Sequence, residues 1–486
     1  MYNPACLLFL VALHSGLLSG VSGAPAPAPT ESPENPFLDP ATGSPENPFS
    51  DPANGSPENP FSDPATPQSD SNSIQSWERW TNSFPGSDTS DPNPLGPKAP
   101  GFGVEFESVA VLFQYIENSQ GTSDGYYDRK GTPIDGGIGS GNRWMLTGDT
   151  TMNDWDGRRG SLTAEFIISG KDVMLGAGMA ALAAREMTAY WKEKKYWTKT
   201  GQTVQIVGDP RNPSPEMDNW SVLVAPEDPL WSAQVTVAMP LAAIDHLFEL
   251  SKTYGYSHKL LSDQISKRSG MVWVSEAFFE NFPTTFPEGH RLDKTDKELR
   301  GFLSLLLSYA KNAHMTRSNE SAKILTPIMP RTSLNSVYEK INEKLNGADL
   351  LQVLEHLACY KWVEVEEDDN TKFVVELDSD WCDGTTPKEN WMRTQEFKTD
   401  PNNPLTVQDW LTNMSNRCMD LLAMVDVVDG QIGAFGDKFE WVFATQEEAP
   451  LFEFRDLRGP FTESFESWVV GAEEAVLELH ETYKKG

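Results

Sequence analysis

The chain has 486 residues, of which 71 are Asp or Glu and 39 are Lys or Arg, so its formal net charge is −32. Nucleic acids and anionic membranes are bound mainly through basic patches, so we expect neither as a partner. With 38% hydrophobic residues, including 15 Trp and 24 Phe, the chain can still build a large core.

Residues 1–23 are expected to form a cleaved secretory signal. An uninterrupted apolar run occupies residues 7–13, and the small residues at 21–23 precede Ala24. The run is too short to span a bilayer comfortably, and no later stretch reaches the roughly 18 apolar residues that a transmembrane helix needs. We therefore expect a secreted, extracellular protein.

Residues 24–101 are rich in Pro, Ser and Asn and are expected to be disordered. The hexapeptide Ser-Pro-Glu-Asn-Pro-Phe occurs three times, at 32–37, 44–49 and 56–61. One aromatic ring per repeat cannot bury enough apolar surface to offset the entropy of ordering the chain. The Asn-Pro-Phe triplets resemble motifs that endocytic adaptor domains bind, so a protein partner is one interpretation and a flexible spacer is the other.

An ordered domain is expected over residues 102–486. Alternating apolar and polar residues predict strands at 103–113, 162–169, 203–207, 233–239, 363–376 and 451–455. Helical periodicity predicts helices at 177–194, 241–254, 297–313, 334–345, 348–358, 406–428 and 462–484. Because strands and helices do not alternate strictly, we expect an α+β fold in which helices cover a mainly antiparallel or mixed sheet.

Cysteines and glycosylation sequons are consistent with secretion. After removal of the signal, Cys359, Cys382 and Cys418 allow at most one internal disulfide, and we favour Cys359 with Cys382. In a eukaryotic secretory pathway, the Asn-x-Ser sequons would be glycosylated at Asn54, Asn219, Asn319 and Asn413.

Polar residues occur at regular positions on four predicted strands. In Gly-Val-Glu-Phe-Glu at 103–107, Glu105 and Glu107 share a face because residues i and i+2 of a strand point the same way. The other three strands contribute Glu165, Gln234, Thr236, Glu453 and Arg455. A sheet with one solvated face would show the same alternation, but four such strands also fit a polar floor for a charged substrate. Paired carboxylates need a cation between them, and their hard oxygens suit Mg²⁺ or Mn²⁺.

At these residues the chain resembles the carboxylate-amine ligase superfamily, which includes glutamate-cysteine ligases, glutamine synthetases and amidoligases. Those proteins carry, in order, a Gly-Val-Glu-x-Glu strand, a Trp-x-Leu-x-x-Asp segment, a Glu-Ile-Val-Ser strand and a Glu-x-Arg strand. The corresponding runs here keep that order and lie at 103–107, 144–149, 165–169 and 453–455. The resemblance covers about residues 102–460 and indicates a divergent, secreted, fungal-type member.

The resemblance implies a curved, mainly antiparallel sheet like that of glutamine synthetase and glutamate-cysteine ligase. It also implies ATP- and Mg²⁺-dependent joining of a carboxylate to an amine, on small-molecule or peptide substrates. The implied metal ligands are Glu105, Glu107, Glu165 and Glu453. The implied nucleotide-binding residues are Gln234, Thr236, Arg331 and Arg455, of which the two arginines would also act in catalysis by holding the transferred phosphate.

Several alternatives stay open at this point. Many relatives carry His or Asn in the strand that here contains Gln234, so a non-catalytic host-interaction or effector protein is the main alternative function. A secreted glycoside hydrolase is the second, because it needs only two carboxylates across a cleft. Arg331 could instead pair with a surface acid, and the Gly-rich run at 136–141 lacks the Lys-Ser/Thr of a P-loop, so we expect a mobile loop there.

Overall fold

The computed structural model describes residues 99–115, 131, 133–136, 143–152, 161–193, 204–205, 220–224, 231–253, 258–261, 270–279, 292–313, 327–367, 370–389, 391–397, 405–416, 436–456 and 464–484. The chain divides into two compact units, Met1–Ser76 and Trp77–Gly486, and every described residue belongs to the second. Several predictions fall outside the described residues: the signal at 1–23, the repeats at 32–61, residues 137–141 of the Gly-rich run, Cys418, and the sequons at Asn54, Asn219 and Asn319.

Ten of the described strands of the second unit form one large sheet in which every pairing is antiparallel. The main order is β15-β16-β7-β1-β4-β3-β2; β6 also pairs with β1 and β5, and β8 pairs with β16. The strands are β1 Gly103–Tyr115, β2 Pro133–Gly136, β3 Trp144–Met152, β4 Ser161–Ile168, β5 Val204–Gln205, β6 Trp220–Val224, β7 Ser232–Ala238, β8 Ile328–Pro330, β15 Phe439–Trp441 and β16 Glu448–Asp456. This confirms the prediction of an α+β protein with a mainly antiparallel sheet.

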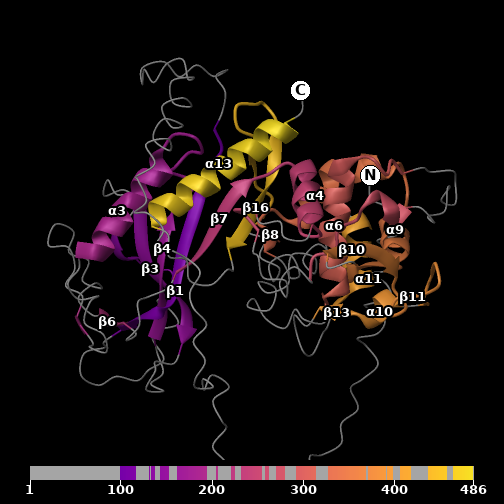
Figure 1. Ribbon diagram of the computed structural model, residues 1–486, viewed down its shortest axis with the longest axis horizontal. Coiled ribbons are helices and arrows are strands. Elements are labelled where there is room, and N and C mark those ends of the chain that lie inside the picture. Colours follow the sequence, from indigo (N-terminus) through magenta and orange to yellow (C-terminus); the bar gives the residue numbers. More distant parts are fainter. Residues whose placement is uncertain are drawn as a thin grey trace, which may run out of the picture. The chain divides into compact units, whose positions relative to one another are not determined.

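One face of the sheet is apolar and is covered by α3 (Met179–Glu193) and α13 (Phe465–Tyr483) (Figure 1). On β1, Val104 and Phe106 are buried on this face, and the Phe106 ring stacks on Phe465 of α13 with ring centroids 4.3 Å apart. Phe166 of β4 contacts Tyr190 of α3 edge to face. Such aromatic packing supplies much of the burial that holds the helices on the sheet.

Residues 241–416, the helical region, contain most of the other helices. These are α4 Leu241–Leu250, α6 Lys297–Lys311, α8 Leu334–Ile341, α9 Leu350–Leu357, α10 Trp391–Thr394 and α11 Val407–Asn416, with the 3₁₀ turns Glu276–Phe279 and Asn342–Leu345. Helix α6 begins at Asp296, whose side chain accepts from the backbone N–H groups of Glu298 and Leu299. At Gly301 a Cβ would lie 2.2 Å from the Leu241 carbonyl oxygen, so the close approach of α6 to α4 requires glycine.

A buried ion pair joins α4 to α6. Arg300 Nη2 lies 2.7 Å from Asp245 Oδ2, and Trp273 Nε1 donates to Asp245 Oδ1 at 3.0 Å. Arg300 Nη1 donates to Glu276 Oε1 at 3.2 Å and to the Lys294 carbonyl at 3.3 Å. Because every charged atom has a partner, this cluster fits a structural role.

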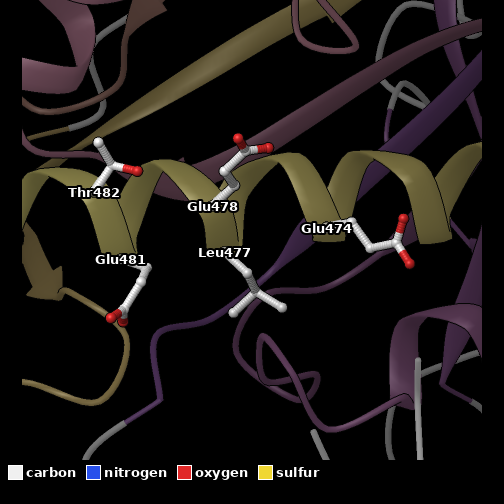
Figure 2. Close-up of a pocket in the computed structure, with 5 residues that line it drawn as sticks. All are labelled: Glu474, Leu477, Glu478, Glu481 and Thr482. Carbon is white, nitrogen blue, oxygen red and sulfur yellow. The ribbon is translucent and has the colours of Figure 1, made fainter. Parts of the chain in front are cut away.

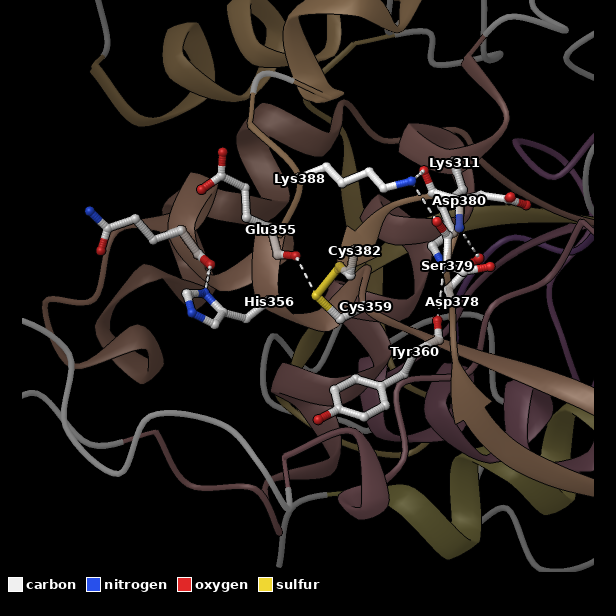
Figure 3. Close-up of a disulfide and its surroundings, with 11 residues drawn as sticks. Lys311, Glu355, His356, Cys359, Tyr360, Asp378, Ser379, Asp380, Cys382 and Lys388 are labelled. Carbon is white, nitrogen blue, oxygen red and sulfur yellow. Dashed lines mark hydrogen bonds and ion pairs between the residues drawn. A yellow bond between two sulfur atoms is a disulfide. The ribbon is translucent and has the colours of Figure 1, made fainter. Parts of the chain in front are cut away.

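The disulfide expected between Cys359 and Cys382 is confirmed (Figure 3). It joins the residue just before β9 (Tyr360–Glu367) to β11 (Cys382–Asp383), with the Cα atoms 5.2 Å apart. Beside it, the Lys311 ammonium at the end of α6 donates to Asp378 Oδ2 and to the Tyr360 carbonyl oxygen, each at 2.8 Å. The disulfide and this ion pair together fix the β-hairpin to the helices.

Some predicted boundaries were wrong. The strand expected at 363–376 is a hairpin of β9 and β10 (Asn370–Leu377), because Asp-Asp-Asn at 368–370 favours a turn. Shorter hairpins follow: β11 with β12 (Thr386–Pro387), and β13 (Glu396–Phe397) with β14 (Leu405–Thr406). Packing also begins before residue 102, since the Gly101 N–H donates to Glu440 Oε2 at 2.8 Å.

Asn413 is a poor glycosylation site in this fold. Its side chain is 6% exposed on α11, where Trp410 and Met414 are also buried. A glycan needs an asparagine amide that faces solvent, so the prediction for this sequon was wrong. Within the described ranges, no helix has the length and apolar character needed to cross a membrane.

Candidate functional site

The polar residues predicted on four strands lie on neighbouring strands, β16, β7, β1 and β4. On β1, Glu105 faces Gln234 of β7, and Gln234 faces Arg455 of β16. Two residues further along β1, Glu107 faces Glu165 of β4. Because directly opposed residues project to the same side of a sheet, all of these side chains lie opposite α3 and α13. We call this side the polar face, and its members are Glu105, Glu107, Glu165, Gln234, Thr236, Glu453 and Arg455.

Two buried threonines hold carboxylates of the polar face. Thr163 Oγ1 donates to Glu107 Oε1 at 2.8 Å, and Thr147 Oγ1 of β3 donates to Glu165 Oε2 at 3.0 Å. Both threonines are fully buried. Sequence reasoning missed them, although Thr163 precedes Glu165 by two residues and so shares its face. The threonines fix the orientation of the carboxylates.

Burial and neighbouring charge raise the pKa of Glu105 to about 7. Burial is the largest cause, and the negative charge of Glu453 adds to it, while Arg331 and Arg455 oppose it. At neutral pH this carboxyl group is therefore close to half-protonated. A cation at this position would restore its charge.

The pKa of Glu165 is raised further, to about 9. Burial is again the largest cause, followed by the charges of Glu105, Asp149 and Glu107, while the hydrogen bond from Thr147 lowers it. Asp149 belongs to the 144–149 run but was given no role from the sequence. The four acids therefore lie close enough to repel one another when ionised, and this repulsion favours the protonated form of Glu165.

The other end of the polar face is built from two guanidinium groups around one carboxylate. Glu453 is completely buried, and Arg331 Nε donates to its Oε2 atom at 2.7 Å. Arg331 Nη2 contacts the same oxygen, and Arg455 Nη2 pairs with Oε1. The Arg331 N–H donates to the Leu451 carbonyl at 2.8 Å, so β16 fixes its backbone. Arg331 thus pairs with a buried acid of the site.

Glu453 Oε1 makes no hydrogen bond but pairs with Arg455 Nη2, whereas two other buried polar atoms of the polar face have neither a hydrogen-bond nor an ion-pair partner among the described residues. They are Gln234 Oε1 and Arg455 Nε, in residues that are 6% and 7% exposed. Unpartnered buried polar atoms are costly and uncommon in folded proteins. They lie on facing residues, so one ligand with both an acceptor and a donor could satisfy the two. Thr236, which faces Glu453 on β7, is half-buried on the same face of the sheet.

The donor chemistry of the polar face fits a hard divalent cation, but the carboxylates are not assembled around one. In the described part of the chain, no three His, Cys, Asp or Glu side chains are grouped so that they could hold a metal ion. Glu453 in particular is held by the two arginines, whereas the sequence predicted it as a metal ligand. Side-chain rotation would be needed to gather Glu105, Glu107 and Glu165, so the metal-ligand assignments stay predictions.

A hollow of about 320 Å³ lies elsewhere, along α13 (Figure 2). It is lined by Glu474, Leu477, Glu478, Glu481 and Thr482. Figure 2 shows Leu477 and Glu481 pointing to one side of the helix and Glu478 to the other, so these groups do not converge on a point. The hollow is separate from the polar face, since α13 covers the opposite side of the sheet.

Comparisons with known proteins give this chain no family. No protein-family profile and no curated protein matches it. Two solved structures are similar to it: a VgrG toxin ACD-domain mutant from Vibrio cholerae in complex with ADP and Mn²⁺, and a Vibrio cholerae toxin of the MARTX/VgrG family. Each is 12% identical to this chain and superimposes with a TM-score of 0.32. The alignment with the ADP and Mn²⁺ complex covers 76% of this chain and 98% of the toxin domain, and the alignment with the second structure covers 78% and 99%. A TM-score this low establishes neither a shared fold nor a shared activity, so the ligase-like topology stays a prediction.

Proposed function

We propose that this protein is an ATP- and Mg²⁺-dependent ligase that joins a carboxylate to an amine as an amide or isopeptide bond. The observation that supports this most strongly is the division of the polar face into two parts. Acids that repel one another when ionised lie at Glu105, Glu107 and Glu165, and two guanidinium groups lie beside them at Arg331 and Arg455. Carboxylates that can hold a metal ion beside guanidinium groups that can hold phosphate oxygens would suit a metal-bound polyphosphate.

Each part of the face has a role in this proposal. Glu105, Glu107 and Glu165 would hold Mg²⁺, which when bound supplies charge neutralisation for the phosphate groups. Arg331 and Arg455 would bind phosphate oxygens through paired N–H donors. Gln234, between Glu105 and Arg455, would orient the nucleotide or the carboxylate substrate.

The reaction proposed has two steps. A substrate carboxylate oxygen attacks the terminal phosphorus of ATP, which breaks the bond to the leaving ADP and forms an acyl phosphate. An amine then attacks the acyl carbon, phosphate leaves, and the amine loses a proton. Stabilising the transferred phosphoryl group would be the task of the two arginines. Small-molecule or peptide carboxylates and amines fit both steps.

We also propose that the ligase acts outside the cell. The support is in the sequence alone: the apolar segment within 1–23 and the polar segment that follows it. The three Ser-Pro-Glu-Asn-Pro-Phe repeats at 32–61 are proposed as a spacer or as a docking segment for a protein partner.

A thermal-shift titration with Mg²⁺ and ATP tests the proposal. A ligand that binds only the native state raises its stability in proportion to the logarithm of its concentration. The wild type should be stabilised by Mg²⁺ and ATP together, and the variants Glu105→Gln and Arg455→Gln should lose that stabilisation while remaining folded. If millimolar Mg²⁺ and ATP leave the melting temperature of the wild type unchanged, the ATP-dependent ligase is excluded.

A non-catalytic interaction protein that keeps this fold is the second candidate. Two observations favour it: Glu453 is bound by two arginines, and the described carboxylates form no metal cluster. Under this alternative the polar face would bind neither Mg²⁺ nor nucleotide. The thermal-shift titration separates the two functions, because only the ligase predicts a stabilisation that depends on Glu105.

A further inference from the structure

We propose that Glu453 is a built-in competitor for the anion site of the polar face, and that it couples anion binding to cation binding. The inference rests on the proposed function, because it assumes that phosphate and a divalent cation both bind this face. Glu453 would occupy the two guanidinium groups while the site is empty. A cation that draws the Glu453 carboxylate away would free them for phosphate.

The geometry shows how completely Glu453 occupies the arginines. Each of its carboxylate oxygens pairs with a different guanidinium group, Oε2 with Arg331 and Oε1 with Arg455. Guanidinium binds carboxylate and phosphate through the same paired donors, so the two anions would compete for them. The side chains of Arg331 and Arg455 are only 10% and 8% exposed, so an anion would reach them mainly by displacing Glu453.

The backbone makes Glu453 a suitable switch. It lies in the middle of β16, opposite Thr236 of β7 and Met329 of β8, so its Cα position is fixed on both sides. Only the side chain can respond to a ligand. Glu453 and Glu105 lie on β16 and β1, on the same face and separated only by β7, and the negative charge of Glu453 raises the pKa of Glu105.

One N–H donor of the Arg455 guanidinium makes no hydrogen bond to the described residues. Its Nε atom is buried and has no partner among the described residues, while Nη2 pairs with Glu453. By contrast, Arg300 of the structural ion pair has a partner for every nitrogen. An unpartnered donor in a buried guanidinium is expected where a ligand completes the site.

Calorimetric titration of the full chain with inorganic phosphate, with and without Mg²⁺, tests the coupling. In the wild type, saturating Mg²⁺ should tighten phosphate binding by about tenfold or more, which is a typical coupling between linked sites. In Glu453→Gln the competing charge is lost. That variant should bind phosphate about tenfold more tightly than the wild type without Mg²⁺, and Mg²⁺ should then change its affinity by less than about twofold.

Glu107→Gln is the matched control. It removes one negative charge from the same face but leaves both pairs of Glu453 with the arginines intact, because Glu107 bonds to Thr163 instead. Its phosphate affinity without Mg²⁺ should change by less than about threefold, an effect of net charge alone. An equal gain in phosphate affinity in Glu107→Gln and Glu453→Gln would overturn the proposal. It would show that the loss of a negative charge, and not the loss of a competing carboxylate, tightens phosphate binding.

Arg331→Gln tests the same idea if Glu453→Gln does not fold. Removing one guanidinium should weaken phosphate binding and, by loosening Glu453, make Mg²⁺ binding tighter than in the wild type. Unchanged or weaker Mg²⁺ binding contradicts the switch. The two failures are distinguishable: if the wild type binds no Mg²⁺ even with phosphate, the proposed function fails. If it binds both ligands without coupling, only the role of Glu453 fails.

Discussion

Two buried clusters of arginine and acid in this protein differ in how completely they are satisfied. In the helical region, both oxygens of Asp245 and every nitrogen of Arg300 have partners. On the polar face, Arg455 has a buried Nε atom without a partner among the described residues, and the acid Glu105 has a pKa of about 7.

We attribute the difference to a structural role for the Asp245–Arg300 cluster and to the proposed ligand-binding role for the polar face. A completely paired cluster gains nothing from a ligand, and breaking it exposes an uncompensated charge to the protein interior. An incompletely paired cluster with repelling acids costs stability in the absence of ligand, and it can recover that free energy when a ligand binds. The predictions below test whether the two clusters differ in this way.

The largest change in the free energy of unfolding is expected at the cluster of Asp245 and Arg300, in which every charged atom has a partner. Replacing Asp245 by Asn removes the buried counter-ion of Arg300 and leaves it only the largely exposed Glu276, so the free energy of unfolding should fall by about 3–5 kcal/mol, as measured by urea denaturation. Glu276→Gln is the control, because Glu276 pairs with the same arginine through a side chain that is 54% exposed. Glu276→Gln should lower the free energy of unfolding by less than about 1 kcal/mol. A loss in Asp245→Asn as small as in the control would show that the buried pair is not structural.

On the polar face we expect a smaller change in the free energy of unfolding, and this change should be an increase. Glu105 has a raised pKa, so its ionisation costs stability at high pH, and the cost disappears as the pH falls from about 7 to 4.5. Glu105→Gln should therefore raise the free energy of unfolding at pH 8 by roughly 1–2 kcal/mol, a value discounted because the side chain is half-buried. The advantage over the wild type should vanish near pH 4.5. Destabilisation at pH 8 would contradict the raised pKa.

Glu473 provides a matched comparison for Glu105. It is buried on α13, accepts from the Gly176 N–H at 2.6 Å, and also has a pKa of about 7, chiefly because of burial. Glu473→Gln should stabilise the protein at pH 8 in the same way as Glu105→Gln. Mg²⁺ with phosphate should reduce the stability gain of Glu105→Gln over the wild type at pH 8. It should leave the stability gain of Glu473→Gln unchanged, because Glu473 lies on the other side of the sheet. An equal response of both variants to Mg²⁺ would show that the cation acts non-specifically.

The smallest effect on stability is expected at Gln234. Its Oε1 atom already lacks a partner among the described residues, so Gln234→Met should change the free energy of unfolding by less than about 1 kcal/mol. The same variant should lose a clear part of the thermal shift caused by Mg²⁺ and ATP. Stability loss of several kcal/mol would mean that Gln234 is a structural residue, as Asp245 is.

The strands of the polar face could be predicted because alternation with period two marks them directly. Val104 and Phe106 on one side of β1, and Glu105 and Glu107 on the other, fix both its face and its register. Short strands such as β8 were missed, since three residues show no period. The turn between β9 and β10 was also missed, because it interrupts a continuous β-forming pattern.

The identity of the polar residues could be predicted better than their interactions. Sequence placed Glu453 among the metal ligands because of its Glu-x-Arg run, but it pairs with Arg331, which is 122 residues away in the chain. Thr147 was missed for the same reason: it reaches Glu165 only because β3 lies next to β4. Local patterns assign a residue to a face, whereas its partners depend on the order of strands, which is set by the whole fold.

Anomalous diffraction from crystals grown with Mn²⁺ and a non-hydrolysable ATP analogue tests the central claim most directly. We predict a manganese ion on the polar face, bound by carboxylates from Glu105, Glu107 or Glu165, with phosphate oxygens on Arg331 and Arg455. The Glu453 side chain should have moved from its position between the two arginines. A structure with nucleotide bound elsewhere, or with no manganese on the polar face at saturating concentration, would contradict the account.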